Sequence, residues 1–393
     1  MVKLMEIDYI NGPRTDKIFG ISKYQMEIFR RVEGVEWNII DYNSITHLIE
    51  RKYKDNLKFK PDNSYDDPNS LPQTKSKTPN FFVDMGKKTL KTIDKHRYIR
   101  TVKNKVKDGN VKHITSQEFA YIQNSLEMDK TIVTCHDLIP WVYEKDRSAF
   151  WKDNISGLKK ADAIITVSEF SKNEIIKHLN YPAKNIHIVK DAVDHSFYYE
   201  NRDKQILNNL GILNHQKVVL YVGSETPRQN VPILIKAFAR LKKEIPGVKL
   251  LKIGESQSYG AREIILNLIN DLHLQEDVIF VGYVPEEDMP RWYNAADILV
   301  YPCEYAGFGL PPLEAMACGT PVITSNTTSL PEVVGEAGIM IDPQDHDLMA
   351  DKMYEILTND GLRNDLIKKG IERSKLFSWD DSAKKTLKVY EGF

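Results

Sequence analysis

Residues 297–325 have the sequence DILVYPCEYAGFGLPPLEAMACGTPVITS, in which strand-like and helix-like segments alternate. An apolar run leads into a loop rich in glycine and proline, then a good helix former, LEAMA, and then a second apolar run. Prolines 311 and 312 suit a first helical turn, which has no use for their missing N–H groups. Because parallel neighbouring strands need a crossover, this stretch predicts one βαβ unit of a parallel sheet.

The same alternation extends through the rest of the chain. Short apolar runs recur in the C-terminal half at 218–223, 249–254, 278–283 and 338–342, and in the N-terminal half at 3–10, 130–135, 162–167 and 185–189. Amphipathic stretches separate most of them. The clearest is 231–243, with Asn230 as its expected N-cap. Ser168 is expected to cap the helix EFSKNEIIKHL that follows it. The pattern predicts an α/β protein with two doubly wound, Rossmann-like domains.

A chain of 393 residues is long for a single core, so two domains are the natural expectation. We expect an N-terminal domain over 1–205 and a C-terminal domain over 206–376. A last segment, 377–393, follows a break at 376–378, and one option is that its helix returns to the N-terminal domain. Residues 40–85 are expected to form a variable loop region.

Composition excludes several classes of protein. The net charge of −1 gives no general attraction to nucleic acid, so no nucleic-acid partner is expected. Three widely spaced cysteines do not suggest a disulfide framework or a zinc cluster. No apolar run approaches the roughly 20 residues needed to span a bilayer, and the N-terminus does not resemble a signal peptide. We expect a cytoplasmic protein.

Residues 86–112 are strongly basic, with ten Lys or Arg against two Asp and a local net charge of +8. One interpretation is an ordinary solvated helix face. The other is a peripheral contact with an anionic membrane at its cytoplasmic face, or with a phosphate-bearing acceptor.

The loop at 302–309 and the helix after it suggest a ligand site, because ligands of doubly wound folds collect where strands end and helices begin. Gly307 and Gly309 allow a ligand to approach the backbone closely. The helix N-terminus favours an anion, most naturally a phosphate. Glu314 lies one turn into this helix, where it either caps its own helix or accepts hydrogen bonds from a sugar diol.

At this point the chain resembles a known family. The stretch 304–323 resembles the signature of the family-four retaining glycosyltransferases of the GT-B fold, also called glycosyl transferases group 1. Further blocks agree in order and spacing: FGISKY (19–24), TCHDLIP (134–140), ADAIITVSEFSKNEI (161–175), VLYVGSETPRQNVPILIKAF (219–238), VGYVPEEDMPRWYNAADILVYP (281–302) and SLPEVVGEAGIMIDP (329–343). The resemblance covers most of the chain except about 40–110.

The resemblance implies a role for each matching residue. A nucleotide-diphosphate sugar would bind the C-terminal domain, with the acceptor held by the N-terminal domain across a cleft. Glu314 matches the acid that binds the donor ribose, and His136 matches the histidine that faces the transferred sugar. Without the family match, His136 is a loop residue that bonds nearby backbone. The remaining implied donor contacts are Gly20, Gly282, Tyr283, Val284, Gly307, Phe308, Gly309 and Leu310.

Three positions depart from the family pattern. Relatives often carry an arginine where this chain has Ser224, a lysine where it has Gln229, and a glutamate where it has Ala306. Arg228 is the nearby candidate cation, or else a solvent-facing loop charge. Glu304, two residues before the vacant position, is a candidate substitute for the missing acid.

The resemblance implies a retaining hexosyltransferase that uses a UDP- or GDP-sugar and a glycan or lipid-linked acceptor. Neither a metal nor another cofactor is expected, since no Asp-x-Asp motif follows a strand. Arg228 would join His136 and Glu314 as a catalytic residue. The departures keep a second possibility open, a catalytically degenerate subunit that binds sugar nucleotide or a partner. A sugar-nucleotide epimerase is a third.

Overall fold

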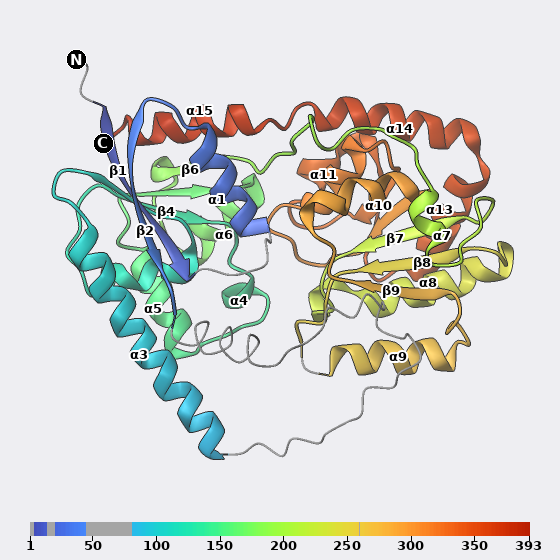
Figure 1. Ribbon diagram of the computed structural model, residues 1–393, viewed down its shortest axis with the longest axis horizontal. Helices are drawn as coiled ribbons and strands as arrows, with labels where there is room; N and C mark the ends of the chain where they lie inside the picture. The colour runs from blue at the N-terminus through green and yellow to red at the C-terminus, as the bar shows by residue number, and fades with distance from the viewer. Residues whose placement is uncertain (1–3, 14–19, 45–80, 259) are drawn as a thin grey trace. The chain divides into compact units, whose positions relative to one another are not determined.

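The structure is a computed structural model that describes residues 4–13, 20–44, 81–258 and 260–393, and it divides into two compact units. The first unit comprises the chain up to Thr166, together with Lys172–Val189 and Ala383–Phe393. The second unit comprises Val167–Ser171 and Lys190–Ser382. Each unit is built around a six-stranded parallel sheet with helices packed against it (Figure 1). The α/β class with two doubly wound units is therefore confirmed.

The first sheet has the strand order β2-β1-β3-β4-β5-β6. Its strands are β1 (Met5–Pro13), β2 (Val35–Tyr42), β3 (Val111–Ile114), β4 (Thr131–Cys135), β5 (Ala163–Thr166) and β6 (Ile186–Ile188). The chain starts in β1, pairs it with β2 on one side and continues from β3 on the other. This reversal between β1 and β3 is a topological switch point, where open α/β sheets bind ligands.

Adjacent residues of β1 serve the two faces of the first sheet, as the period of two in a strand requires. Ile10 belongs to a core cluster with Tyr98 and Ile155, which come from the helices α3 and α5. Tyr9 points to the opposite face, where its ring lies 5.3 Å from that of His113. The hydroxyl of Tyr390, at the end of the chain's last helix, lies 2.6 Å from Nδ1 of His113. The end of the chain is therefore part of the first unit.

The second sheet has the strand order β12-β11-β10-β7-β8-β9, with its switch point between β7 and β10. Its strands are β7 (Val218–Val222), β8 (Lys249–Ile253), β9 (Val278–Gly282), β10 (Ile298–Tyr301), β11 (Val322–Ser325) and β12 (Ile339–Ile341). All six lie where apolar runs predict them. The four inner strands, β11, β10, β7 and β8, are largely buried, as expected for strands covered on both faces, whereas the edge strands β9 and β12 are only partly buried.

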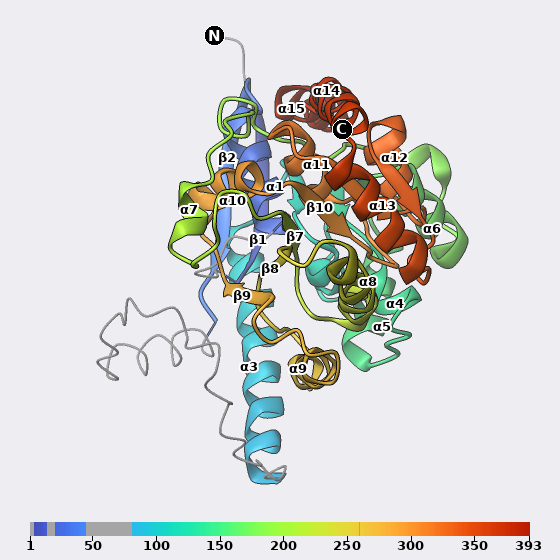
Figure 2. The same cartoon turned by 90° about the vertical axis from the view of Figure 1, so that its right-hand side faces the viewer.

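The helices of the second unit cover both faces of its sheet. Figure 1 shows α8 and α9 on one side of β7, β8 and β9, and α10 and α11 on the other; Figure 2 gives the view at right angles. The α-helices lying within this unit are α7 (Gln205–Asn208), α8 (Val231–Glu244), α9 (Ala261–Asp271), α10 (Met289–Ala295), α11 (Leu310–Ala317), α12 (Leu330–Val334), α13 (His346–Thr358) and α14 (Asp360–Ser374).

The helices of the first unit are α1 (Gly20–Arg31), α3 (Phe81–Lys105), α4 (Ile139–Val142) and α5 (Ala149–Leu158). Two further helices run from one unit's residues into the other's, α6 (Glu169–Leu179) and α15 (Trp379–Tyr390). Short 3₁₀ turns occur at η1 (Gln117–Asn124), η2 (Ala183–Asn185), η3 (Pro227–Gln229), η4 (Glu286–Asp288) and η5 (Gly335–Ala337).

Both predicted helix caps have a definite outcome. The Ser168 hydroxyl accepts a hydrogen bond from the N–H of Ser171 at 3.0 Å, which confirms it as a cap of α6. Asn230 occupies the N-cap position of α8, as predicted, but its side chain does not cap the helix. This residue precedes α8 but adopts the left-handed conformation at φ 57°, and its side-chain amide donates to the carbonyl of Pro343 at 2.6 Å. Because its side chain is engaged elsewhere, it makes no capping bond.

The proposed variable region and the basic segment also need correction. Strand β2 continues to Tyr42 and α3 begins at Phe81, so both ends of the range 40–85 are regular structure, and 45–80 lies outside the described residues. Lys112 belongs to the buried strand β3, and its ammonium bonds the Asp129 carboxylate at 2.5 Å. Lys95 forms a more exposed pair with Asp153. Two of the ten basic residues therefore have acidic partners within the first unit, and Lys112 is buried and is not part of a solvated helix face.

Candidate functional site

The loops after β7 and β10 meet at the switch point of the second sheet. The N–H of Glu304 donates to the carbonyl of Arg228 at 2.8 Å. The Arg228 guanidinium donates to the carbonyl of Tyr305 at 3.1 Å and contacts Sγ of Cys303 at 3.7 Å. Arg228 is therefore half-buried, and its guanidinium contacts the loop that follows β10.

Backbone forms much of the rim at the carboxyl ends of the neighbouring strands. The N–H of Gly254, after β8, donates to the carbonyl of Gly282, at the end of β9, at 2.7 Å. Gly254 has φ 108°, and a Cβ there would lie 2.4 Å from the carbonyl oxygen of Gly223. Only glycine fits such a close approach of two backbones. The next residues, Tyr283 and Val284, are half-buried.

The loop at 306–309 is fixed by the residues that follow β11. The N–H of Ala306 donates to the hydroxyl of Thr328 at 3.2 Å. The Ser329 hydroxyl lies 2.8 Å from the carbonyl oxygen of Ala306 and 2.7 Å from that of Phe308. Ala306 is only 4% exposed, so the position that lacks the family's acid is a buried one.

The carbonyl of Gly307 is held separately by two hydroxyls of the same unit. Ser168 donates to it at 2.8 Å and Ser171 at 3.3 Å. Gly309 then turns the chain into α11 with φ 122°, where a Cβ would lie 2.7 Å from Leu330. Helix α11 starts at Leu310. Pro311 and Pro312 carry no N–H and the N–H of Leu313 bonds the carbonyl of Gly309, so the backbone donor of this first turn is the N–H of Leu310, which follows a loop whose carbonyls already have partners. This arrangement suits an anion at the helix N-terminus.

Glu314 lies one turn into α11 and is 6% exposed. Its Oε2 accepts a hydrogen bond from the hydroxyl of Tyr293, in α10, at 2.8 Å. Burial and the nearby carboxylate raise the pKa of Tyr293 well above its usual value. The tyrosine therefore stays a donor and orients the carboxylate of Glu314.

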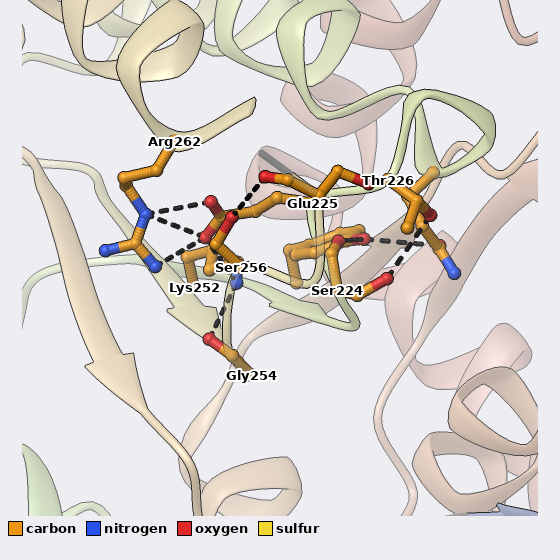
Figure 3. Close-up of polar contacts among 10 residues, drawn as sticks. Ser224, Glu225, Thr226, Lys252, Gly254, Ser256 and Arg262 are labelled. Carbon is orange, nitrogen blue, oxygen red and sulfur yellow. Dashed lines mark hydrogen bonds and ion pairs between the residues drawn. The ribbon is translucent and has the colours of Figure 1, made fainter. Parts of the chain in front are cut away.

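The loop after β7 carries the substituted phosphate-binding positions. The side-chain oxygen of the buried Gln229 accepts a hydrogen bond from the Tyr221 hydroxyl at 3.2 Å. Ser224 is half-buried, and its hydroxyl lies 3.3 Å from that of Thr226 (Figure 3). Neither side chain supplies the charge that an arginine or lysine would bring.

A buried ionic cluster lies beside these two residues. The Glu225 carboxylate is 2.8 Å from Nζ of Lys252, in β8, and 2.5 Å from the guanidinium of Arg262, in α9 (Figure 3). Burial by itself raises the pKa of Glu225, but the two cations outweigh it and hold the pKa below the usual value. The cluster fixes Glu225, and with it the backbone on both sides, to the sheet.

Glu304, the candidate substitute for the missing acid, is half-buried, and its carboxylate bonds the side-chain amide of Gln344. This contact places it next to the residues that follow β12. The structure thus gives Glu304 a defined partner beside the loop.

Two of the predicted site residues belong to the first unit. Gly20 is the exposed first residue of α1, at the carboxyl end of the first sheet's opening β–α connection. His136 follows β4 and is 6% exposed, and its backbone N–H donates a hydrogen bond to Oε1 of Gln117 at 3.1 Å. Its ring meets the ring of Tyr24 edge-on at 5.0 Å. Burial lowers the pKa of His136 to about 4, so the imidazole is neutral at pH 7.

Among the described residues, no group of three or more His, Cys, Asp or Glu side chains has a metal-binding arrangement. In the same part of the chain, no helix has the length and apolar character needed to cross a membrane. All three cysteines are buried, and none forms a disulfide.

Comparison with known proteins identifies the family. The model of "Glycosyl transferases group 1" matches residues 203–373, and that of "Glycosyltransferase Family 4" matches 97–197. The chain is 36% identical over 278 residues to the O-antigen chain mannosyltransferase B of Escherichia coli, covering 69% of this chain and 72% of that protein. The chain belongs to glycosyltransferase family 4.

Other relatives of this family-4 glycosyltransferase are also glycosyltransferases. The chain is 30% identical over 280 residues to the serotype-specific mannosyltransferase WbdA of Escherichia coli, covering 67% of this chain and 33% of that protein. Sucrose-phosphate synthase from Thermosynechococcus elongatus matches its fold with a TM-score of 0.73 at 22% identity, over 99% of this chain and 98% of that one. Anabaena HepE in complex with UDP and glucose also gives 0.73, at 16% identity and full coverage of both chains. The fold is therefore GT-B.

Sequence reasoning missed the residues that hold the site in shape. Tyr293 and Ser329 both lie inside blocks that match the family, but their neighbours in sequence give no sign of their partners. Thr328, with φ 57°, is equally invisible in a linear pattern. A search for hydroxyls on the loops after parallel strands would have selected Thr328 and Ser329, which follow β11, but not Tyr293, which lies in α10.

Proposed function

We propose that this glycosyltransferase moves a mannosyl residue, with retention of configuration, from a nucleotide-diphosphate donor to a glycan or lipid-linked acceptor. Family membership supports glycosyl transfer. The names of the two Escherichia coli relatives support mannose, because both are mannosyltransferases. The buried Glu314, held by Tyr293 next to a loop that offers backbone groups, is the observation that favours a nucleotide-sugar donor.

Each group has a place in the proposed reaction. The bond between the anomeric carbon and the diphosphate oxygen breaks, and the acceptor oxygen bonds to the same carbon on the same face. The acceptor proton passes to the departing phosphate oxygen. Negative charge grows on the diphosphate, so the N–H of Leu310 at the start of α11 and the guanidinium of Arg228 would stabilise the transition state. Glu314 would hold the ribose hydroxyls.

His136 is assigned to the sugar or the acceptor. Because its pKa lies near 4, it is a neutral hydrogen-bonding group at physiological pH and not a cation that could pair with the diphosphate. We assign the acceptor to the first unit and the donor to the second.

A donor panel tests the proposal. The purified protein is incubated with GDP-mannose, UDP-glucose, UDP-galactose and UDP-N-acetylglucosamine, each with and without EDTA, and nucleotide release and product mass are recorded. We expect GDP-mannose to give the largest transfer, with the α-anomer retained and no effect of EDTA. Glu314→Ala should remove most nucleotide-dependent thermal stabilisation, since a charged hydrogen bond contributes roughly 1.5–3 kcal/mol.

The same panel separates the alternatives. A degenerate subunit would bind nucleotide without releasing product from any donor. An epimerase would return a nucleotide sugar of unchanged mass. A strict requirement for a divalent metal, or inversion at the anomeric carbon, would contradict the proposed mechanism.

A further inference from the structure

A basic cavity lies at the open edge of the first sheet, on the edge strand β6. Its volume is about 340 Å³, and all its lining residues belong to the first unit. It is lined by Lys172, Ile186, His187, Ile188, Val189, Lys385, Lys388 and Val389. Three elements contribute: α6 supplies one lysine, β6 the apolar floor and the imidazole, and α15 the other two lysines.

The cavity has an excess of positive charge. Lys385 and Lys388 are three positions apart on α15, which places both ammonium groups on one face of the helix. No carboxylate is among the lining residues, and within the described part of the chain Lys172, Lys385 and Lys388 form no ion pair. Partial burial lowers the pKa of His187, and the nearby Lys172 acts in the same direction. Three like charges around one cavity, with no carboxylate in its lining, favour an anion.

The position of α15 makes this charge a fixed feature. Tyr390 is fully buried, and its hydroxyl bonds His113 at 2.6 Å, so the end of the helix is anchored to the sheet. Val389, beside it, is 6% exposed and forms part of the cavity wall. The two lysines are therefore presented by a rigid element, while their exposed ends can adjust to a ligand.

We propose that this cavity binds a phosphate group, with Lys172, Lys385 and Lys388 as its ligands and the aliphatic side chains of β6 as its floor. The shared chemistry is a phosphate monoester or diester, supplied either by a soluble phosphorylated compound or by a lipid headgroup. The site does not depend on the proposed donor reaction, because it involves none of the residues assigned to donor or acceptor.

Two probes distinguish the sources. Inorganic phosphate is titrated into the protein by calorimetry at low ionic strength. Separately, the protein is sedimented with vesicles of phosphatidylcholine alone or with phosphatidylglycerol added. The test variant is Lys385→Glu with Lys388→Glu, and both positions are exposed. The matched control is Lys103→Glu with Lys105→Glu, which reverses two exposed charges on α3.

The proposal predicts that wild type binds at least one probe, that the α15 variant loses about tenfold or more in affinity, and that the α3 variant is unchanged. Phosphate binding identifies a soluble source, and binding to anionic vesicles alone identifies a headgroup. Lys172→Gln should weaken the same probe. The proposal is overturned if wild type binds neither probe, or if the α3 variant loses as much as the α15 variant.

Transfer to a soluble acceptor provides an independent readout. It should be the same in wild type and in both double variants, since neither touches the donor residues. A protein that binds phosphate through α15 but transfers no sugar would contradict the proposed function and support this site. A protein that transfers sugar but binds neither probe would support the proposed function and contradict this site.

Discussion

The carboxylate of Glu225 lies 2.8 Å from the ammonium of Lys252, with side chains 0% and 2% exposed. Arg262 completes the cluster from α9 and is one-third exposed. Loss of the carboxylate would leave Lys252 buried without a counter-charge, whereas loss of Lys252 would leave Glu225 paired with Arg262. We therefore expect Glu225→Gln to cost about 3–5 kcal/mol of unfolding free energy and Lys252→Met clearly less, measured by urea denaturation.

The double variant is the control for this asymmetry. Glu225→Gln with Lys252→Met removes both buried charges and leaves only Arg262, which water reaches. It should recover much of the stability that Glu225→Gln loses. If Lys252→Met is as damaging as Glu225→Gln, the buried charge is not what decides the stability here.

His113 should make the first unit sensitive to mild acid. Burial, with a smaller contribution from His136, lowers the pKa of His113 to about 3. Between pH 6.5 and 3 the unfolded chain binds a proton that the folded chain does not, so stability falls as the pH decreases through this window. At pH 5 the loss is about 2 kcal/mol for one such histidine.

Urea denaturation at pH 7 and pH 5 measures this loss. His113→Gln should reduce the difference between the two pH values, although it also weakens the contacts with Tyr390 and Thr134. A variant as sensitive to pH as wild type would show that other groups control the acid response. Glu225 contributes to acid sensitivity at lower pH. Because the pKa of Glu225 is lowered in the folded protein, its contribution to stability is lost only as the pH falls below the usual value of 4.5.

Tyr293→Phe should weaken donor binding without disturbing the fold. The variant keeps the ring in the core and removes only the hydroxyl that orients Glu314, so we expect a loss of roughly tenfold in nucleotide affinity. Titration calorimetry with the nucleoside diphosphate measures it. Tyr181→Phe, which removes a buried hydroxyl that bonds Ala161 in the first unit, is the matched control and should bind nucleotide like wild type.

His136→Ala should separate binding from transfer. The residue is assigned to the sugar or acceptor, so nucleotide affinity should stay near that of wild type while transfer falls by at least about tenfold. Parallel measurement of nucleotide affinity and initial rate checks this. Collapse of nucleotide binding would place His136 in the donor site or in the fold itself.

Ala306→Glu tests whether the site is adapted or decayed. The position is buried, and its backbone N–H and carbonyl are bonded to Thr328 and Ser329. If the pocket has adapted to its own sugar, wild type transfers at least one sugar, and the new carboxylate impairs that transfer or changes the preferred donor. If the wild type is inactive with every donor and the single change Ala306→Glu restores turnover, the site is a decayed one. Glu304→Ala, assayed with the same donors, shows whether that acid supplies the contact.

The sequence by itself determined the elements and their class. Apolar runs at 218–223 and 297–302 predicted β7 and β10, because a strand buried on both faces has to be apolar throughout. Prolines 311 and 312 fixed the start of α11, since proline disrupts any later turn. The conserved order of the family blocks then indicated a glycosyltransferase, as the comparisons confirm.

Only the tertiary structure decided which side chains meet. Asn230 has the chemistry of a cap, but the approach of Pro343 takes its amide elsewhere. Lys112 is one of the ten basic residues of the segment 86–112, but in the structure its side chain is buried and bonds Asp129. Tyr293 and Glu314 are 21 positions apart, in the helices before and after β10, and the packing of α10 against α11 brings them into contact. Local propensity acts over a few residues, whereas hydrogen-bond partners and burial depend on packing between segments distant in sequence.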